Sequence, residues 1–290
     1  MMARIYSPYG KSGKDMVAKY HCRLNHAGFK LVRAALEAEG LPWEKHDPFC
    51  ETCALTKTKS HPHVESRHIE EDIFPGEYLV CDAIGPLARS QGGKKYWLFL
   101  KDKKSGYTMS FVVSSKAEFG KCVLMGLKKF SAHSGRRVKE VRMDGDGPFV
   151  STELAEKIFE NGTVPTWSSP YDHPQNGLAE GNVNTKFKDA CAAMKGSGAP
   201  SYMWPSVVDY VDTTRNWLRS VETNEGFITP SMSLKGKKVG PDIFKMLPFG
   251  VKVVVQYAKG QRPGHKTLTQ VRGWVGAFVG YGEAHGFGGI

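Results

Sequence analysis

Three acidic residues stand in sequence contexts that suit metal-dependent phosphoryl-transfer chemistry. Asp82 lies in CDAIGP, Asp144 in VRMDGDGPF and Glu180 in SPYDHPQNGLAEGN, and 35 positions separate the last two acids. Carboxylates that converge raise one another's pKa values unless cations neutralise them. Oxygen ligands suit Mg²⁺ or Mn²⁺ rather than zinc, and two such ions about 3.5–4 Å apart can activate an attacking oxygen and stabilise a leaving one. Together the three carboxylates predict a divalent-metal site, although any one of them alone is more typical of a solvated loop.

A second set of residues has the types and spacing of a zinc site. His21 and His26 are separated by four residues and Cys50 and Cys53 by two, with 23 residues between the two pairs. Two imidazoles and two thiolates complete a tetrahedral shell, which predicts a closed, structural site whose metal contributes directly to folding. The alternative is an incidental cysteine pair close to surface histidines. An exchange of ligands is also open, because four other histidines lie nearby: His46, His61, His63 and His68.

Composition indicates a globular, intracellular protein. Of the 290 residues, 40% are hydrophobic and 11% aromatic, which is ordinary for a folded chain. No uninterrupted apolar run approaches the length of a membrane span, about 18 residues, and the N-terminal segment MMARIYSPYGKSGKD contains no apolar run typical of a signal peptide. In a reducing compartment a close cysteine pair favours a metal site over a disulfide. The scattered cysteines are expected to be small buried residues: Cys22, Cys81, Cys122 and Cys191.

The net charge of +11 is concentrated away from the N-terminus. Residues 1–75 carry 11 Lys and Arg against 10 Asp and Glu (+1), residues 76–220 carry 20 against 15 (+5), and residues 221–290 carry 9 against 4 (+5). Basic side chains interleaved with aromatic ones suit a polyanionic partner, because phosphate neutralisation supplies most non-specific affinity for nucleic acid. By charge alone, a merely soluble basic surface is an equally good interpretation.

The segments that must position the three carboxylates alternate between strand and helix patterns. Three strand-like runs come first, at residues 78–85, 94–103 and 106–115, and the last two form a predicted hairpin. The expected elements that follow are a helix at 116–131, a strand at 139–144, a helix at 151–161, a strand at 163–169, and helices at 177–194 and 201–219. This order predicts an α/β domain with a mixed five-stranded sheet. If its first and fourth strands are adjacent, Asp82 and Asp144 emerge side by side, and a helix packed across that edge can bring Glu180 to them.

The flanking segments suggest four parts. Residues 1–60 form the metal-binding head, with one helix predicted at 16–40 and the cysteine pair on a turn. Residues 61–76 are a polar linker, residues 77–222 the catalytic core, and residues 223–290 a basic C-terminal extension. That extension contains two strand-like runs, VKVVVQY and WVGAFVGY.

These motifs, taken in order, resemble those of copia-type (Pseudoviridae-like) LTR retrotransposon integrases. CDAIGP is similar to their first-aspartate motif, VRMDGDGPF to their Arg-Ser-Asp-Asn-Gly-Gly-Glu-Phe segment, and SPYDHPQNGLAEG to their Pro-Tyr-x-Pro-Gln-Gln-Asn-Gly-x-x-Glu segment. The spacing between Asp144 and Glu180 is that of the D,D-35-E triad, and the two His and two Cys resemble the zinc head of the same proteins. WVGAFVGY is similar to the Phe-Val-Gly-Tyr element that follows the copia core. The likeness covers about residues 17–282.

The resemblance implies a ribonuclease-H-like core with assigned residue roles. Asp82, Asp144 and Glu180 would be the catalytic ligands of Mg²⁺ (or Mn²⁺), and His21, His26, Cys50 and Cys53 would hold Zn²⁺. Pro174, Gln175 and Asn176 would belong to a mobile active-site loop, with Asn176-Gly177 supplying a turn. The expected DNA-contacting residues are Gln175, Asn176, Lys186 and Lys188.

The resemblance also implies a reaction, partners and a location. The reaction is 3′-end processing of the element's cDNA followed by strand transfer into target DNA. The partners are those two DNAs and further copies of the chain, with no membrane. The location is the nucleus for integration and a cytoplasmic particle before it.

Two alternatives are open from the sequence. Where the family has a basic stretch after the glutamate, this chain has Gly181-Asn182-Val183-Asn184, and it has Pro148 in place of the usual glutamate. These departures leave room for a decayed retroelement fragment that only binds nucleic acid. A nuclease of the same fold that cuts RNA in hybrids is the other alternative, against which the zinc head and the Gln-Asn-Gly segment argue.

Overall fold

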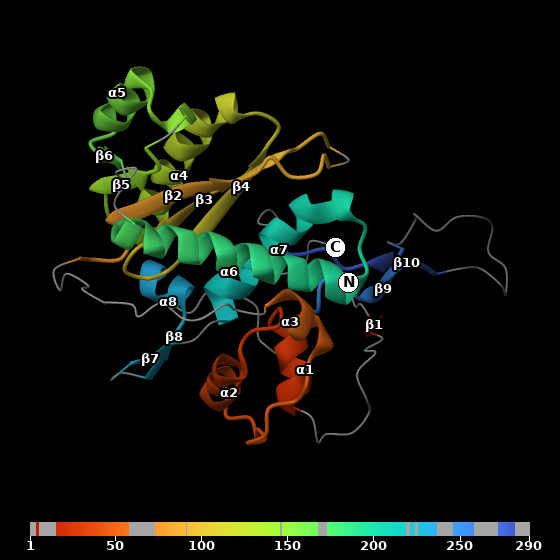
Figure 1. Ribbon diagram of the computed structural model, residues 1–290. Coiled ribbons are helices and arrows are strands. Elements are labelled where there is room, and N and C mark those ends of the chain that lie inside the picture. Colours follow the sequence, from red (N-terminus) through yellow and green to blue (C-terminus); the bar gives the residue numbers. More distant parts are fainter. Residues whose placement is uncertain are drawn as a thin grey trace.

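A computed structural model gives the arrangement of the chain in three dimensions (Figure 1). It describes residues 4–5, 16–57, 73–90, 92–145, 147–167, 173–218, 221–223, 226–236, 246–257 and 272–281. Within these ranges only the backbone is described for residues 4–5, 173–184, 218, 221–223 and 226. None of the described helices is both long enough and apolar enough to cross a bilayer.

A mixed five-stranded sheet forms the centre of the molecule. Its strands are β2 (Tyr78–Ile84), β3 (Tyr96–Asp102), β4 (Thr108–Val113), β5 (Glu140–Met143) and β6 (Val164–Trp167). Their order across the sheet is β4-β3-β2-β5-β6, with antiparallel pairing from β2 to β4 and parallel pairing of β2 with β5 and of β5 with β6. The fold-class prediction of a ribonuclease-H-like mixed sheet is confirmed, including the adjacency of its first and fourth strands.

One face of the sheet is covered by α4 (Phe119–Ser134) and α5 (Thr152–Glu160), which lie on the same side in Figure 1. The 3-10 turn η1 (Lys116–Glu118) leads into α4, and η2 (Gly147–Phe149) precedes α5. Ser151 caps α5 by accepting a hydrogen bond from the backbone N–H of Leu154. Alternate residues of β2, β3 and β5 pack with both helices in one buried cluster, which includes Leu98, Leu100, Val123, Leu127 and Ile158. Because successive side chains of a strand point to opposite faces of a sheet, the intervening residues of these strands lie on the face away from α4 and α5.

The opposite face is covered by α6 (His173–Ser197) and α7 (Trp204–Leu218), joined through the turn η3 (Ser201–Met203). Trp97 of β3 packs against both helices in a second cluster. The backbone is helical from His173, so the loop and turn predicted around Pro174 to Asn176 are wrong. Proline is favoured in the first turn of a helix, where its missing N–H has no intrahelical acceptor.

The N-terminal head contains α1 (Met16–Arg23), α2 (Phe29–Ala38) and α3 (Glu51–Thr56). The prediction of a single helix over residues 16–40 is wrong, because the helical conformation is interrupted between α1 and α2. Asn25 and His26 both have positive φ, at 53° and 54°. That left-handed conformation is uncommon outside glycine, although Asn and His are enriched in it, and it turns the chain sharply after His21.

The C-terminal part packs against both the helices of the core and the N-terminal head. It consists of the hairpin β7 (Val221–Thr223) and β8 (Gly226–Ile228), the helix α8 (Pro230–Lys235), and the strands β9 (Lys252–Gln256) and β10 (Gly273–Ala277). β1 (Arg4–Ile5), β9 and β10 form a three-stranded antiparallel sheet. Phe249 and Val253 join the cluster on α7, and Met246 joins the core of the head. The division of the chain at residues 60, 76 and 222 stays a prediction.

Candidate metal centres

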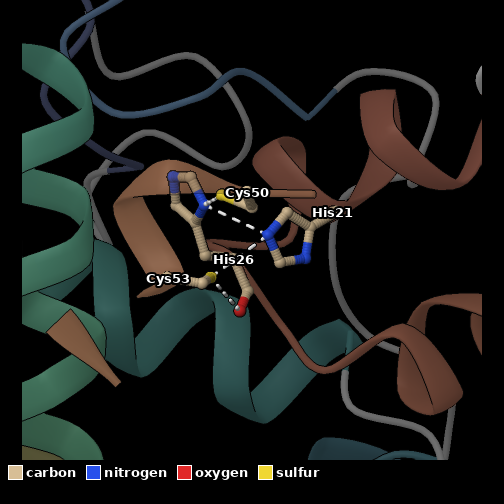
Figure 2. A group of neighbouring side chains, drawn as sticks. All are labelled: His21, His26, Cys50 and Cys53. Carbon is tan, nitrogen blue, oxygen red and sulfur yellow. Dashed lines mark hydrogen bonds between the residues drawn. The ribbon is translucent and has the colours of Figure 1, made fainter. Parts of the chain in front are cut away.

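Four side chains of the head converge on one point (Figure 2). His26 Nδ1 lies 3.2 Å from His21 Nε2 and 3.3 Å from Cys50 Sγ, and His21 Nε2 lies 3.2 Å from Cys53 Sγ. All four donor atoms lie within 4.8 Å of one another. A tetrahedral zinc ion with bonds of about 2.0–2.3 Å holds its nitrogen and sulfur donors about 3.3–3.8 Å apart. The donor set and its spacing therefore fit zinc, as the sequence predicts.

Local backbone geometry brings the two histidines together. His21 lies in the last turn of α1, and the left-handed turn at Asn25 and His26 folds the second imidazole back onto the first. The N–H of His26 donates to the carbonyl of His21 at 2.7 Å, which closes this turn. Cys50 is the N-cap of α3 and Cys53 lies in its first turn, so a single short helix presents both thiols.

The electrostatics of the site favour a bound cation. His21 Nδ1–H donates to the carbonyl of Ala27 at 2.7 Å, which leaves the lone pair on Nε2, toward the other ligands. Burial lowers the pKa of both His21 and His26 to about 4, so both imidazoles are neutral and can act as ligands at neutral pH. Burial also raises the pKa of Cys53 to about 12. A thiol in this position ionises readily only beside a cation such as zinc.

Of the four alternative histidine ligands, one lies within the described residues. His46 is exposed and is not a member of the converging group. His61, His63 and His68 lie outside the described residues.

The head is joined to α6 by contacts that the sequence did not reveal. Lys57 Nζ donates to the carbonyl of His26 at 2.7 Å and pairs with Asp189 Oδ1 of α6 at 2.8 Å. Asp189 Oδ2 pairs in turn with Arg215 of α7 at 2.7 Å. Lys57 and Asp189 are 132 residues apart along the chain, and Asp189 and Arg215 lie on different helices, so no local pattern could have linked them.

Asp82 lies in β2 on the face of the sheet that α6 covers. Its direct cross-strand partner is Phe99, and residues directly opposite in a sheet share a face. The ring of Phe99 lies 4.8 Å from Lys186 Nζ of α6, which identifies that face. The Asp82 side chain is half-buried, and its Oδ1 accepts a hydrogen bond of 2.6 Å from the N–H of Ala83.

Asp144 is the first residue after β5. The parallel ladder pairs Tyr78 with Glu140 and Val80 with Arg142. The same register continued by two residues sets Asp82 level with Asp144. The Asp144 side chain is exposed, whereas Met143 before it is buried in the core.

Glu180 lies in the second turn of α6, whose backbone passes over the sheet on the Asp82 side. The side chains of Glu180, Gln175 and Asn176 lie outside the described residues, so their roles stay predictions.

Lys186 does not have the surface position that its predicted role requires. Its side chain is 1% exposed, its ammonium pairs with Asp212 of α7, and it donates to Ser110 Oγ at 3.0 Å. The prediction that Lys186 contacts DNA is therefore wrong, because a phosphate cannot reach a cation enclosed between two helices and a sheet. Lys188 is half-buried, and its contact with DNA stays a prediction.

With the fold and the candidate metal centres described, comparison with known proteins shows distant homology to polyproteins of Ty1/copia-type transposons. It is 23% identical over 253 residues to the transposon Ty1-DR6 Gag-Pol polyprotein of Saccharomyces cerevisiae, covering 81% of this chain and 14% of that polyprotein. It is also 23% identical over 271 residues to the retrovirus-related Pol polyprotein from transposon TNT 1-94 of Nicotiana tabacum, and this match covers 91% of this chain and 19% of that polyprotein. The chain thus spans less than a fifth of the length of either relative.

Among solved structures, the simian T-cell lymphotropic virus intasome in complex with PP2A regulatory subunit B56 gamma is similar over 79% of this chain and 76% of its own chain. The TM-score is 0.47 and the sequence identity 16%. No protein-family model matches the sequence.

Proposed function

We propose that this chain is a retrotransposon integrase, a Mg²⁺-dependent polynucleotidyl transferase that trims the 3′ ends of element cDNA and joins them to target DNA. The proposal rests above all on the parallel pairing of β2 with β5, whose register sets Asp82 level with Asp144. Asp82 faces α6, the helix that contains Glu180. Two acids at adjacent strand ends and a third on the helix across them supply the oxygen-only donor set that Mg²⁺ prefers.

The surroundings of these acids suit an open site that admits DNA. Asp82 is half-buried and Asp144 is exposed, so a phosphodiester can approach from solvent. The metal ions, when bound, supply activation of the attacking oxygen and neutralisation of the leaving one. Asp82, Asp144 and Glu180 would hold those ions. In end processing, water would attack a phosphodiester near the cDNA end and break its P–O3′ bond, which frees a 3′-hydroxyl and releases the terminal nucleotides with the phosphate. In strand transfer, that 3′-hydroxyl would attack a target phosphodiester and displace the 3′-oxygen of the target strand, so no side chain is bonded covalently to DNA.

The zinc head has a structural role in this proposal. Its four protein ligands complete the coordination shell, which leaves no position for substrate. The metal instead stabilises a three-helix head whose own core is small.

The proposed partners are inferred from the net positive charge of the chain and from its resemblance to retrotransposon polyproteins. The excess of +10 over residues 76–290 suits the phosphate backbones of cDNA and target DNA. Lys188, Gln175 and Asn176 are the proposed DNA contacts. The protein would act as a multimer, because integration joins two cDNA ends, and it would work in the nucleus after an intracellular, cytoplasmic particle stage.

The test is Asp82→Asn in the full chain. Joining is assayed with Mg²⁺, a supercoiled target and a pool of duplexes with randomised termini, so that the assay does not depend on one end sequence. The variant should lose joining entirely while binding duplex DNA as tightly as wild type does. Glu156→Gln, which removes an exposed acid of α5, should retain full joining. Joining by Asp82→Asn at the wild-type rate would refute the proposal.

One observation favours the alternative of DNA binding without catalysis. The segment after Glu180 lacks the basic residues of the family, and the nearest cation, Lys186, is buried. An end complex would thus have fewer phosphate contacts close to the acids. Wild type that binds duplexes but joins no terminus in the pool would establish this alternative.

A further inference from the structure

A chain of paired charges connects the zinc head to the helix that contains Glu180. Lys57 lies at the end of α3, one turn after the ligand Cys53. Its ammonium holds both the carbonyl of the ligand His26 and the carboxylate of Asp189 on α6. Asp189 is almost wholly buried and is paired on its other side with Arg215. The proposed chemistry of strand transfer uses none of these groups.

The position of Lys57 depends on the metal site. Lys57 can bridge to Asp189 only when α3 is formed and when the carbonyl of His26 points toward it. Both conditions depend on the same turn and helix that the four ligands hold together. A small head of this kind gains much of its folding free energy from zinc, so the bridge should exist only in the loaded protein.

A second contact joins α6 to the ligand itself. A Cβ placed on Gly196 would lie 3.0 Å from His26 Nε2, so the backbone of α6 packs directly against the ligand's ring. The ring nitrogen that faces α6 is the one that does not face the other ligands. Asp189 and Gly196 thus fix the C-terminal half of α6 against the head at two points, two turns apart.

The stiffness of a helix carries this constraint toward the acids. Glu180 is nine residues before Asp189, or about 13.5 Å along the same helix. A helix held at two points of one half has little freedom to rotate or slide in the other half. Lys57 is also the least disruptive place to cut the link, because Asp189 keeps Arg215 as a partner when Lys57 is removed.

We propose that the zinc-loaded head positions α6, with Lys57 and Asp189 as the positioning residues, so that occupancy of the zinc site controls the order of the helix that contains Glu180. The consequence for Glu180 rests on the proposed function, whereas the coupling between zinc and α6 does not.

The experiment measures amide hydrogen exchange in peptides from 173–197 of the full chain, with zinc and after chelation. In wild type, chelation should speed exchange in α6 at least tenfold. In Lys57→Met the difference between the loaded and chelated states should fall below about threefold. Coupling is reciprocal, so zinc affinity should fall by the same factor as the protection. Lys157→Met, which removes the exposed pair with Glu153 on α5, should behave as wild type does.

Cobalt(II) absorption reports independently whether the site forms. Lys57→Met at saturating Co²⁺ should keep the d–d bands of a tetrahedral site with two sulfur and two nitrogen donors, while α6 stays unprotected. Asp189→Asn removes the carboxylate that Lys57 pairs with. This variant should also keep the cobalt bands while α6 stays unprotected.

Full zinc-linked protection in both variants would overturn the proposal. So would loss of the cobalt bands in both, because the contact would then be needed to form the site rather than to transmit its occupancy. Hydrogen exchange and cobalt absorption do not depend on catalysis. Both measurements therefore test the coupling between zinc and α6 even if the protein has no integrase activity.

Discussion

Replacement of Lys186 by methionine separates a structural role from a DNA-binding one. In Lys186→Met the ammonium that pairs with Asp212 and lies over the rings of Trp97 and Phe99 is lost, while an unbranched apolar side chain is kept. Asp212 retains a hydrogen bond of 3.0 Å from Thr108 Oγ1 but has lost its compensating charge. Removal of one partner of a buried ion pair destabilises a protein by about 3–5 kcal/mol.

That loss of stability should lower the melting temperature by a measurable amount. For a chain of this size each kcal/mol shifts Tm by about 2–4 °C, so Tm should fall by roughly 6–20 °C. Thermal unfolding followed by circular dichroism checks this. A double variant, Lys186→Met with Asp212→Leu, should recover most of the loss, because it leaves no buried charge unpaired.

DNA binding supplies the contrasting measurement. Below the Tm, the dependence of duplex affinity on salt should be unchanged in Lys186→Met, because the side chain touches no phosphate. The matched control is Lys188→Met, two residues along the same helix and half-buried. If the proposed phosphate contact of Lys188 is real, its loss lowers the salt slope by about one, with little change in Tm. An unchanged Tm in Lys186→Met together with a salt slope lower by one would refute this reasoning.

Two further predictions concern pH and backbone packing. Because burial holds the pKa of His21 and His26 near 4, against 6.5 when unfolded, their contribution to stability is present above about pH 6.5 and is lost as pH falls toward 4. Urea unfolding at pH 7.5 and 5.0 should show the free energy of unfolding falling with pH, and no fall would contradict the burial of the two rings. Gly250→Ala should lower Tm, since φ is +74° and the new Cβ would lie 2.3 Å from Ser197 Cβ. An unchanged melting curve for that variant would show that the close approach of this loop to α6 is not maintained.

The sheet of the core was predictable because its signals are local. Each strand is an apolar run bounded by turn residues, and a parallel strand after a helix usually lies beside an earlier one. From that order followed the adjacency of β2 and β5 and the level positions of Asp82 and Asp144. The zinc ligands were predictable for a related reason, since residue type and spacing suffice when the metal enforces the geometry.

The features that the sequence did not reveal depend on distant partners or on unmarked backbone conformations. The break after α1 is made by the left-handed residues Asn25 and His26, whereas the one glycine between the two helices, Gly28, has an ordinary negative φ at the N-cap of α2. Nothing in the sequence around Lys186 distinguishes it from a surface lysine. Its burial depends on Asp212, which lies on another helix. Helix periodicity alone could not pair two charges across α6 and α7.

The short strand β1 has a consequence for synthesis of the protein on the ribosome. Arg4 and Ile5 pair with Val254 and Val253, so β1 cannot form its pairing until β9 has been synthesised. At roughly 5–20 residues per second, the interval between their translation lasts about 12–50 s. During that time the nascent chain can close its central sheet, but the apolar face of α7 that Phe249 and Val253 later cover stays open to chaperones or to aggregation.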